Sequence, residues 1–405
     1  KGLFRRLAVF AGGFSLEAAE LVCDADLDSL AGLVDMSLVK ATGEARFLTL
    51  ETIREYAGKR LTESGEGDAT AARHAEYFAR LADELDEARQ RFGDAGPALA
   101  QLEIEQSNLR AGLAWARTAG DGALQLRLLL GAAGMFLRGS QSEFRRLLEE
   151  ALDLGTEDAR LRGRAEAGLA FAAYRQGDYS ASRAAATRSL TLAEQTGDSR
   201  IRASALNYLS SCELADGNVE KARALLEQAT EAYRVDGNNR GIGVTLINLG
   251  DVAIRAGAYS DAVDLTVEAI ALLRPLGDPT PVHVALLNLA TACVQLDRLD
   301  EAEAYGRESL EIVAGVADLV GVSCCVRVFA AVAARRGDGG RAARLMGAAE
   351  RIRAEIDLGL EPSEAVLQED LVARLGQLLS PDRLKKALDE GEELSSEAAI
   401  EYALA

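Results

Sequence analysis

Apolar and small residues recur along the second half of the chain with a period of 40 residues. Five short turn sequences are spaced by this interval, and each has a small residue five positions after its start and another seven positions before it. A large apolar residue, Leu or Phe, precedes the earlier small position every time. The turns begin at Gly177, Gly217, Gly257, Asp297 and Gly337. Several properties that share one period over five turns indicate a repeat array.

Each repeat is predicted to contain two helices of about 17 residues, because a second turn marker follows the first by 20 residues. Glycine at these turns supplies the positive φ of a helix C-cap, and the Asp or Asn that follows caps the next helix. The small residues let the two helices approach closely. These features are typical of tetratricopeptide repeats, lengthened beyond the usual roughly 34 residues. Stacked pairs of this kind predict a right-handed α-solenoid.

Residues 1–65 follow a different pattern, in which helices flank two short alternating strands. Ser15 is expected to cap a helix, a second helix is expected from about Leu27 to Met36, and strands are expected at 37–41 and 46–50 around a hairpin at 42–44. With a further helix at 51–61, this order predicts a winged helix. Its candidate recognition helix is acidic and has no Arg, Lys, Asn or Gln. We therefore interpret it as an adaptor between domains rather than a reader of DNA.

The predicted fold is mostly α, with an N-terminal winged helix followed by a right-handed solenoid of tetratricopeptide-like repeats. The predicted domains are a winged helix at 1–65, a helical linker at 66–119, a tetratricopeptide-like superhelix at 120–350 and a C-terminal helical cap at 351–405. In the linker we expect helices at 69–92 and 97–118. The superhelix is expected to open with a degenerate repeat, at 124–137 and 144–154, whose turn lies at Gly139-Ser140.

Composition and motifs limit the classes of partner and activity expected for the chain. A formal net charge of −19 argues against direct binding of nucleic acid. No apolar run reaches the roughly 18 residues of a membrane span, so we expect no membrane contact and a cytoplasmic location. The five cysteines lack metal-ligand spacing, and catalytic motifs such as G-x-S-x-G and H-E-x-x-H do not occur. We expect no metal and no enzymatic activity. The chain starts at Lys1, and we interpret it as part of a longer protein.

Five segments carry a family resemblance: Leu3–Phe14, Leu33–Val39, Leu50–Ala57, Leu102–Arg110 and Ala114–Ala116. They resemble the region after the nucleotide-binding domain in bacterial STAND-type regulatory ATPases, which are common in actinobacteria. These regulators join a P-loop ATPase, a winged helix and a tetratricopeptide-like sensor, often with a DNA-binding or cyclase output domain. The resemblance covers essentially the whole chain. It implies an upstream nucleotide-binding domain, with ATP as a cofactor of the parent protein and none in this piece.

The sequence departs from this family in two places. No G-x-x-x-x-G-K-[ST] motif occurs, so the ATPase itself is not in this piece. In related plant and animal switches a Met-His-Asp motif of the winged helix touches the nucleotide, and its histidine position is Leu50 here. A nucleotide contact at Leu50 therefore does not carry over.

Resemblance to tetratricopeptide arrays also implies which residues face a ligand, because the first helix of each repeat lines the concave face. Polar residues at the inward positions of these helices are Asn248, Asn288, Arg255, Asp251, Gln295, Arg175, Asn207, Arg327 and Arg335. Asparagines in consecutive repeats resemble a ladder that grips an extended peptide, since one amide both donates and accepts hydrogen bonds. An asparagine there can equally bond a neighbouring helix.

Two functional hypotheses follow. In the first, the chain is the signal-sensing and protein-interaction module of a STAND-type transcriptional regulator. A peptide, protein or small-molecule effector then binds the groove, the winged helix relays the effect to the upstream ATPase, and oligomerisation can accompany activation. In the second, the repeats form a scaffold for protein assembly that senses nothing.

Overall fold

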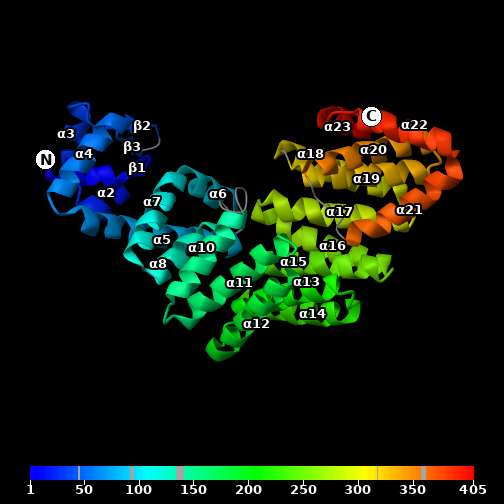
Figure 1. The fold of residues 1–405 in the computed structure, drawn as a ribbon, viewed down its shortest axis with the longest axis horizontal. Coiled ribbons are helices and arrows are strands. Elements are labelled where there is room, and N and C mark those ends of the chain that lie inside the picture. The colour runs from blue at the N-terminus through cyan, green and yellow to red at the C-terminus, as the bar shows by residue number, and fades with distance from the viewer. Residues whose placement is uncertain (44–45, 92–94, 134–140, 317, 357–361) are drawn as a thin grey trace. The chain divides into compact units, whose positions relative to one another are not determined.

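The computed structural model describes residues 1–405 except 44–45, 92–94, 134–140, 317 and 357–361, and its ribbon is drawn in Figure 1. The fold is mostly α-helical, as predicted. The chain divides into two compact units, residues 1–208 and residues 209–405. The division falls inside the helix α13 (Ser199–Ala215) of the repeat array.

The N-terminal part of the first unit combines short helices with a three-stranded antiparallel sheet of order β1-β3-β2. Phe47 of the central strand pairs with Phe14 on one side and Ala41 on the other. The hydroxyl of Ser15 accepts a hydrogen bond from the Ala18 N–H, which confirms the predicted N-cap. Part of the predicted hairpin lies outside the described residues. The elements are α1 (Gly2–Arg6), η1 (Leu7–Val9), β1 (Phe14–Ser15), α2 (Leu16–Cys23), α3 (Leu27–Asp35), β2 (Lys40–Thr42), β3 (Arg46–Leu48) and α4 (Glu51–Glu63).

The long helix α5 (Gly67–Arg91) connects this part to the repeats and packs against α2, α7 and α8. The single helix expected from Pro97 to Thr118 is wrong, because two helices meet at Glu105 instead. They are α6 (Ala95–Ile104) and α7 (Gln106–Ala119). The side chain of Glu105 is buried at this junction, where Arg46 and Asn108 donate hydrogen bonds to it.

The repeat region consists of paired helices, as the 40-residue period predicts. The expected turn at Gly139-Ser140 lies outside the described residues. The helices are α8 (Gly122–Gly131), α10 (Gln141–Leu154), α11 (Ala159–Arg175), α12 (Tyr179–Thr196), α13 (Ser199–Ala215), α14 (Val219–Asp236), α15 (Asn239–Arg255), α16 (Tyr259–Leu273) with η2 (Arg274–Leu276), α17 (Pro279–Gln295), α18 (Leu299–Gly315), α19 (Leu319–Arg335) and α20 (Gly339–Ile356).

The periodic turns have the backbone conformation that the sequence predicts. All five first-turn residues have positive φ, from 60° at Asp297 to 85° at Gly337. The aspartates after the turns cap the following helices: Asp178 accepts from the Ala181 N–H and Asp318 from the Gly321 N–H. Glycine tolerates the left-handed conformation without steric cost, and aspartate tolerates it better than most other residues. The turns are therefore confirmed as helix C-caps and the aspartates as N-caps, whereas Asn218 makes no side-chain cap to its helix.

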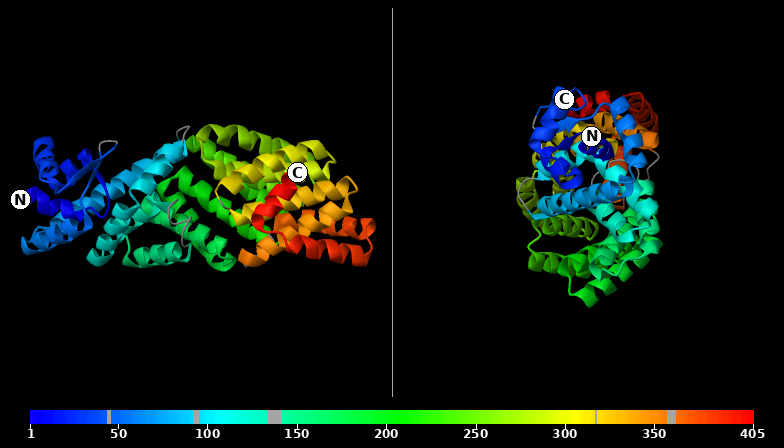
Figure 2. Two further views of the ribbon diagram at one scale, coloured as in Figure 1. Left: turned by 90° about the horizontal axis from the view of Figure 1, so that it is seen from above. Right: turned by 90° about the vertical axis from the view of Figure 1, so that its left-hand side faces the viewer.

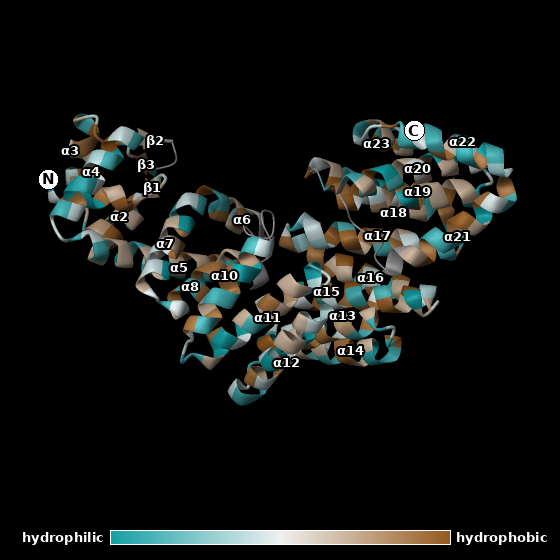
Figure 3. Cartoon of the chain, viewed as in Figure 1, coloured by the Kyte–Doolittle hydropathy of each residue, from teal (hydrophilic) through white to brown (hydrophobic). Residues whose placement is uncertain are grey.

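The small residues lie where the two helices of a repeat meet. Ser182 is fully buried and donates its hydroxyl to the Ala170 carbonyl across the pair. A Cβ added at Gly250 would stand 2.8 Å from Thr266 Cγ2, so only glycine fits that approach. Figure 3 shows that the repeat helices mix apolar and polar residues rather than being apolar all round. The close helix pairing predicted from these positions is confirmed.

After α20 the chain continues as α21 (Pro362–Leu378), α22 (Pro381–Glu392) and α23 (Ser396–Leu404). α22 packs along α20, α23 packs against α19 and α20, and α21 packs against α19 and α15. Figure 2 shows these orange and red helices from two further directions. Among the described residues, no helix is long and apolar enough to cross a membrane.

Candidate functional site

The first helices of three consecutive repeats, α15, α17 and α19, pack in series within the second unit. Their adjoining surface, which we call the α15–α17–α19 face, carries seven of the nine predicted ligand residues. A pocket opens on it between Ile254 of α15, Asn288 of α17 and Arg327 of α19, with Leu367 of α21 on its rim. The pocket encloses about 30 Å³, room for roughly one or two water molecules.

The two asparagines of the predicted ladder lie on α15 and α17, and both are half-buried. Asn288 lines the pocket and donates its Nδ2–H to the Ile247 carbonyl at 3.2 Å. This bond uses the donor half of the amide to join two repeats. Its oxygen accepts no hydrogen bond from the residues that the structure describes. One half of the Asn288 amide is thus committed to the fold, and its acceptor half is open.

Asp251 and Arg255, one turn apart on α15, form an ion pair. The Arg255 Nε lies 3.2 Å from Asp251 Oδ2, and both side chains are more than four-fifths buried. The Arg255 guanidinium also approaches the Leu214 carbonyl at 3.5 Å. These two predicted residues therefore supply a neutral pair rather than an isolated cation.

Gln295 and Arg335 occupy equivalent positions on α17 and α19, and they are joined. Arg335 donates to Gln295 Oε1 at 3.1 Å and, through Nε, to Asp370 Oδ2 at 3.2 Å. Asp370 belongs to α21 and also accepts from Arg374 at 3.0 Å. The Nε2 of Gln295 is buried and has no hydrogen-bond partner among the described residues. The cationic end of this face is therefore held by a carboxylate of the C-terminal segment.

Among the described residues, Arg327 is the largest fully buried side chain, with an exposed fraction of 1%. It lines the pocket, but its guanidinium lies inside the protein and has polar partners there. The other two predicted residues belong to the first unit, where Arg175 is exposed at the end of α11 and Asn207 is buried in α13.

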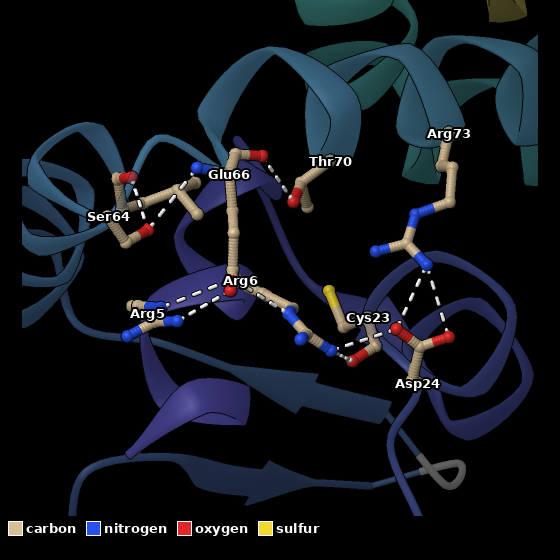
Figure 4. Close-up of polar contacts among 9 residues, drawn as sticks. Arg5, Arg6, Cys23, Asp24, Ser64, Glu66, Thr70 and Arg73 are labelled. Atoms are coloured by element: carbon tan, nitrogen blue, oxygen red, sulfur yellow. Dashed lines mark hydrogen bonds and ion pairs between the residues drawn. The ribbon is translucent and has the colours of Figure 1, made fainter.

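An ionic network ties the N-terminal helices to the start of α5, as Figure 4 shows. Glu66 accepts hydrogen bonds from Arg5 at 2.6 Å and Arg6 at 3.0 Å. Asp24, at the end of α2, accepts from Arg6 at 2.8 Å and from Arg73 of α5 at 2.9 Å. The hydrogen bonds from Arg5 and then Arg6 lower the pKa of Glu66 to about 2. The carboxylate is therefore charged throughout the neutral range.

A second joint, fully buried, is built around Asn108 of α7. Its Nδ2 donates to the Gly13 carbonyl at 2.9 Å, and its Oδ1 accepts from the Ala11 N–H at 3.0 Å. His74 of α5 approaches the same Oδ1 at 3.4 Å and packs edge-on against Phe10. Burial lowers the pKa of His74 to about 4, so the ring is neutral at pH 7. His74 is therefore a packed, buried histidine.

The far part of α5 reaches the repeats through Asp86, which is 5% exposed. Its Oδ2 lies 3.4 Å from Arg164 of α11 and 3.1 Å from Arg200 of α13. α5 therefore contributes His74 to the Asn108 joint, Arg73 to the ionic network and the buried Asp86 carboxylate to the contact with two repeat helices. It joins the N-terminal elements to the array physically.

Sequence reasoning missed the residues that make these long-range contacts. Asp370, Asp86 and Glu105 find partners 35 to 114 positions away along the chain. The spacing of Leu367, Leu371 and Leu375 was visible as one face of a helix. Nothing in the local pattern, however, indicated that this face returns to α19 and α15.

Comparison with known families identifies the repeats. The family model for the tetratricopeptide repeat matches residues 161–235 and 201–274. The chain therefore carries tetratricopeptide repeats.

Relatives share parts of the chain. A Mycobacterium tuberculosis (strain H37Rv) protein named as an HTH-type transcriptional regulator is 45% identical over 136 residues, which cover 31% of this chain and 15% of that protein. An uncharacterised protein of the same strain is 40% identical over 89 residues, covering 19% of this chain and 23% of its own length. The chain thus matches less than a quarter of the length of these relatives.

A solved structure extends the similarity to the fold of nearly the whole chain. The crystal structure of a Signal Transduction ATPase with Numerous Domains (STAND) protein with a tetratricopeptide repeat sensor, from Pyrococcus horikoshii, matches with a TM-score of 0.60 at 16% identity. The match covers 96% of this chain and 61% of that one. This chain accordingly shares its fold with that protein over the matched length.

Proposed function

We propose that this chain is the signal-sensing and protein-interaction module of a STAND-type transcriptional regulator, and that its repeats bind a peptide, protein or small-molecule effector. The α15–α17–α19 face is the observation that carries the proposal. Amide and guanidinium groups recur there at 40-residue intervals, at 248 and 288 and at 255, 295 and 335, around a pocket. Stacked repeats present such groups as a continuous binding surface.

The polar groups on this face suit a peptide backbone. The Asn288 oxygen is available to accept an N–H, and the buried Gln295 Nε2 is available to donate to a carbonyl. A ligand that met both groups would satisfy a buried donor that otherwise costs stability. Peptide recognition is therefore favoured over recognition of an apolar metabolite.

The helix α5 supports a relay from the repeats to the N-terminal elements. We propose that residues 1–65 act as a winged-helix adaptor that contacts an upstream nucleotide-binding domain, where ATP binds. The helix α3 carries Asp28 and Asp35 and is capped by Asp26, and these carboxylates would repel DNA phosphates. The module then binds no nucleic acid directly, catalyses no reaction itself and works in the cytoplasm. Oligomerisation on activation is part of the same proposal.

A peptide display selection on the immobilised chain tests the binding proposal. Peptides enriched by the wild-type chain are expected to bind the Asn248→Ala, Asn288→Ala double variant at least tenfold more weakly, because the amides that face the ligand are removed. The matched control is Gln228→Ala on α14, the second helix of its repeat. Stability should change by about 1 kcal/mol or less, since both asparagines are half-buried. Equal binding to all three proteins would reject this face as the site.

The relay is tested in the full-length parent protein with a selected peptide as the probe. The Asp86→Ala change removes the carboxylate that joins α5 to Arg164 and Arg200. We expect peptide affinity to persist while the response of ATP hydrolysis to the peptide is lost. The reason is that coupling requires a contact whose strength differs between the peptide-free and the peptide-bound state. If the peptide binds the wild-type parent and leaves hydrolysis unchanged, the scaffold function is correct instead.

A further inference from the structure

The helix α21 leaves the stacking order of the repeats. In a regular array the helix after α20 would stack on it, but α22 takes that place. The α20–α22 contact is so close that a Cβ at Gly347 would stand 2.3 Å from the Leu388 carbonyl oxygen. α21 instead packs against α19 and α15, the two outer helices of the α15–α17–α19 face. Figure 1 shows α21 running back from α22 along these first helices.

One side of α21 is apolar and faces the repeats. Leu367, Leu371 and Leu375, spaced by four residues, are all buried. Leu367 belongs to an apolar cluster that includes α15 and α17, and Leu371 and Leu375 belong to a cluster that includes α19 and α20. The opposite side carries Glu369 and Val372, which are exposed. This is the arrangement of an amphipathic helix laid on a groove.

The polar contacts of α21 fall on the residues predicted to hold a ligand. Asp370 accepts from Arg335 at 3.2 Å, and Arg335 in turn binds Gln295. Leu367 closes the pocket beside Asn288 and Arg327. With α21 in place, the remaining volume of about 30 Å³ cannot admit even one amino-acid side chain of ordinary size. A ligand side chain can therefore enter this pocket only after Leu367 of α21 has moved.

We propose that α21 is a displaceable, built-in occupant of the α15–α17–α19 face, and that the effector is a protein segment that forms an acidic amphipathic helix. This inference rests on the proposed sensor function and names its ligand class. Charge complementarity sets the chemistry: the face offers Arg335, so the incoming helix carries a carboxylate where α21 has Asp370, with leucines three positions before it and one and five positions after it. The effector replaces the contacts of α21 with its own, and the released α21 distinguishes the bound state from the free one.

A fluorescent peptide with the sequence of residues 362–378 tests this inference by binding to the full chain in trans. In the Asp370→Arg chain, two arginines face the new one, so α21 is loosened and Arg335 is left for the peptide's own aspartate. We expect that chain to bind the peptide at least tenfold more tightly than wild type. The matched control, Glu369→Arg, makes the same kind of change on the exposed side of the same helix and should bind like wild type.

A second variant keeps the test valid if Asp370→Arg misfolds. Leu367→Ala weakens the hold of α21 without adding charge, and it should also raise peptide affinity above wild type. Circular dichroism must show equal helix content in all four chains. If Asp370→Arg and Leu367→Ala bind the peptide no better than Glu369→Arg, the inference is wrong. The sensor proposal itself would fail only if display-selected peptides also bound the Asn248→Ala, Asn288→Ala variant with wild-type affinity. The two failures are therefore distinguishable.

Discussion

The stacking of α22 on α20 predicts that a glycine-to-alanine substitution has opposite effects on stability at Gly391 and at Gly376. A Cβ at Gly391 would stand 2.1 Å from the Arg344 carbonyl oxygen and 2.8 Å from its carbon. An ordinary contact needs about 3.4 Å, so Gly391→Ala must push α22 more than 1 Å away from α20. Gly376 of α21 has no atom within 4 Å of the same added carbon, and Gly376→Ala meets no obstacle.

The expected magnitudes follow from these contacts. Overpacking of a close helix contact costs about 1–3 kcal/mol, and the separation also weakens dispersion along the whole seam. Alanine regains about 0.5–1 kcal/mol of helix propensity over glycine. Gly391→Ala should therefore destabilise α22 by roughly 1–2 kcal/mol or more, whereas Gly376→Ala should stabilise α21 by up to about 1 kcal/mol.

Hydrogen–deuterium exchange read by mass spectrometry measures the opening of each helix separately, which suits an array whose parts open locally. Peptide fragments from α22 should exchange about tenfold faster or more in Gly391→Ala. Fragments from α21 should exchange more slowly in Gly376→Ala. If α22 exchanged at the wild-type rate in Gly391→Ala, α22 would not stack on α20 at this distance. The placement of α22, rather than α21, next to α20 would then be wrong.

Two further predictions concern the first unit, whose unfolding can be followed by the fluorescence of Trp115, the single tryptophan. The pKa of His74 is lowered from 6.5 to about 4, so the unfolded chain takes up a proton first as the pH falls. The free energy of unfolding should decline by up to about 3 kcal/mol between pH 6.5 and 4. In His74→Gln the slope of this free energy against pH should flatten between about pH 6.5 and 5. An unchanged slope would refute the conclusion that His74 is buried and neutral. Asn108→Ala leaves the Ala11 N–H and the Gly13 carbonyl without their partner and should destabilise the unit by about 2–4 kcal/mol, read from urea unfolding, whereas a loss below 1 kcal/mol would contradict the buried joint.

The repeat architecture could be predicted because its determinants are local. Positive φ at Gly177 and the cap formed by Asp178 depend on residues within one turn, and a fivefold repetition makes the signal unmistakable. The small residues could be interpreted for the same reason, since Ser182 and Ala170 face each other across one helix pair. Periodicity fixes such features without knowledge of the tertiary fold.

The candidate site could be predicted only in part. The period assigns Asn288, Gln295 and Arg335 to one side of their helices, and the structure brings them together on one face. The 40-residue period gives no information on partners that lie outside the repeats. The pairing of Asp370 with Arg335 depends on the path of the chain after α20, which no repeated pattern encodes. The same applies to Asp86, whose arginine partners are 78 and 114 residues away. Whether the nine residues contact a ligand stays a prediction.

Hydrogen–deuterium exchange of the full chain, with and without a display-selected peptide, tests the sensor proposal most directly. The predicted result is slower exchange in α15, α17 and α19 together with faster exchange in α21, at peptide concentrations that match the measured affinity. Slower exchange confined to the second helices α14, α16 and α18, with α15, α17 and α19 unchanged, would contradict the proposal that this face receives the effector.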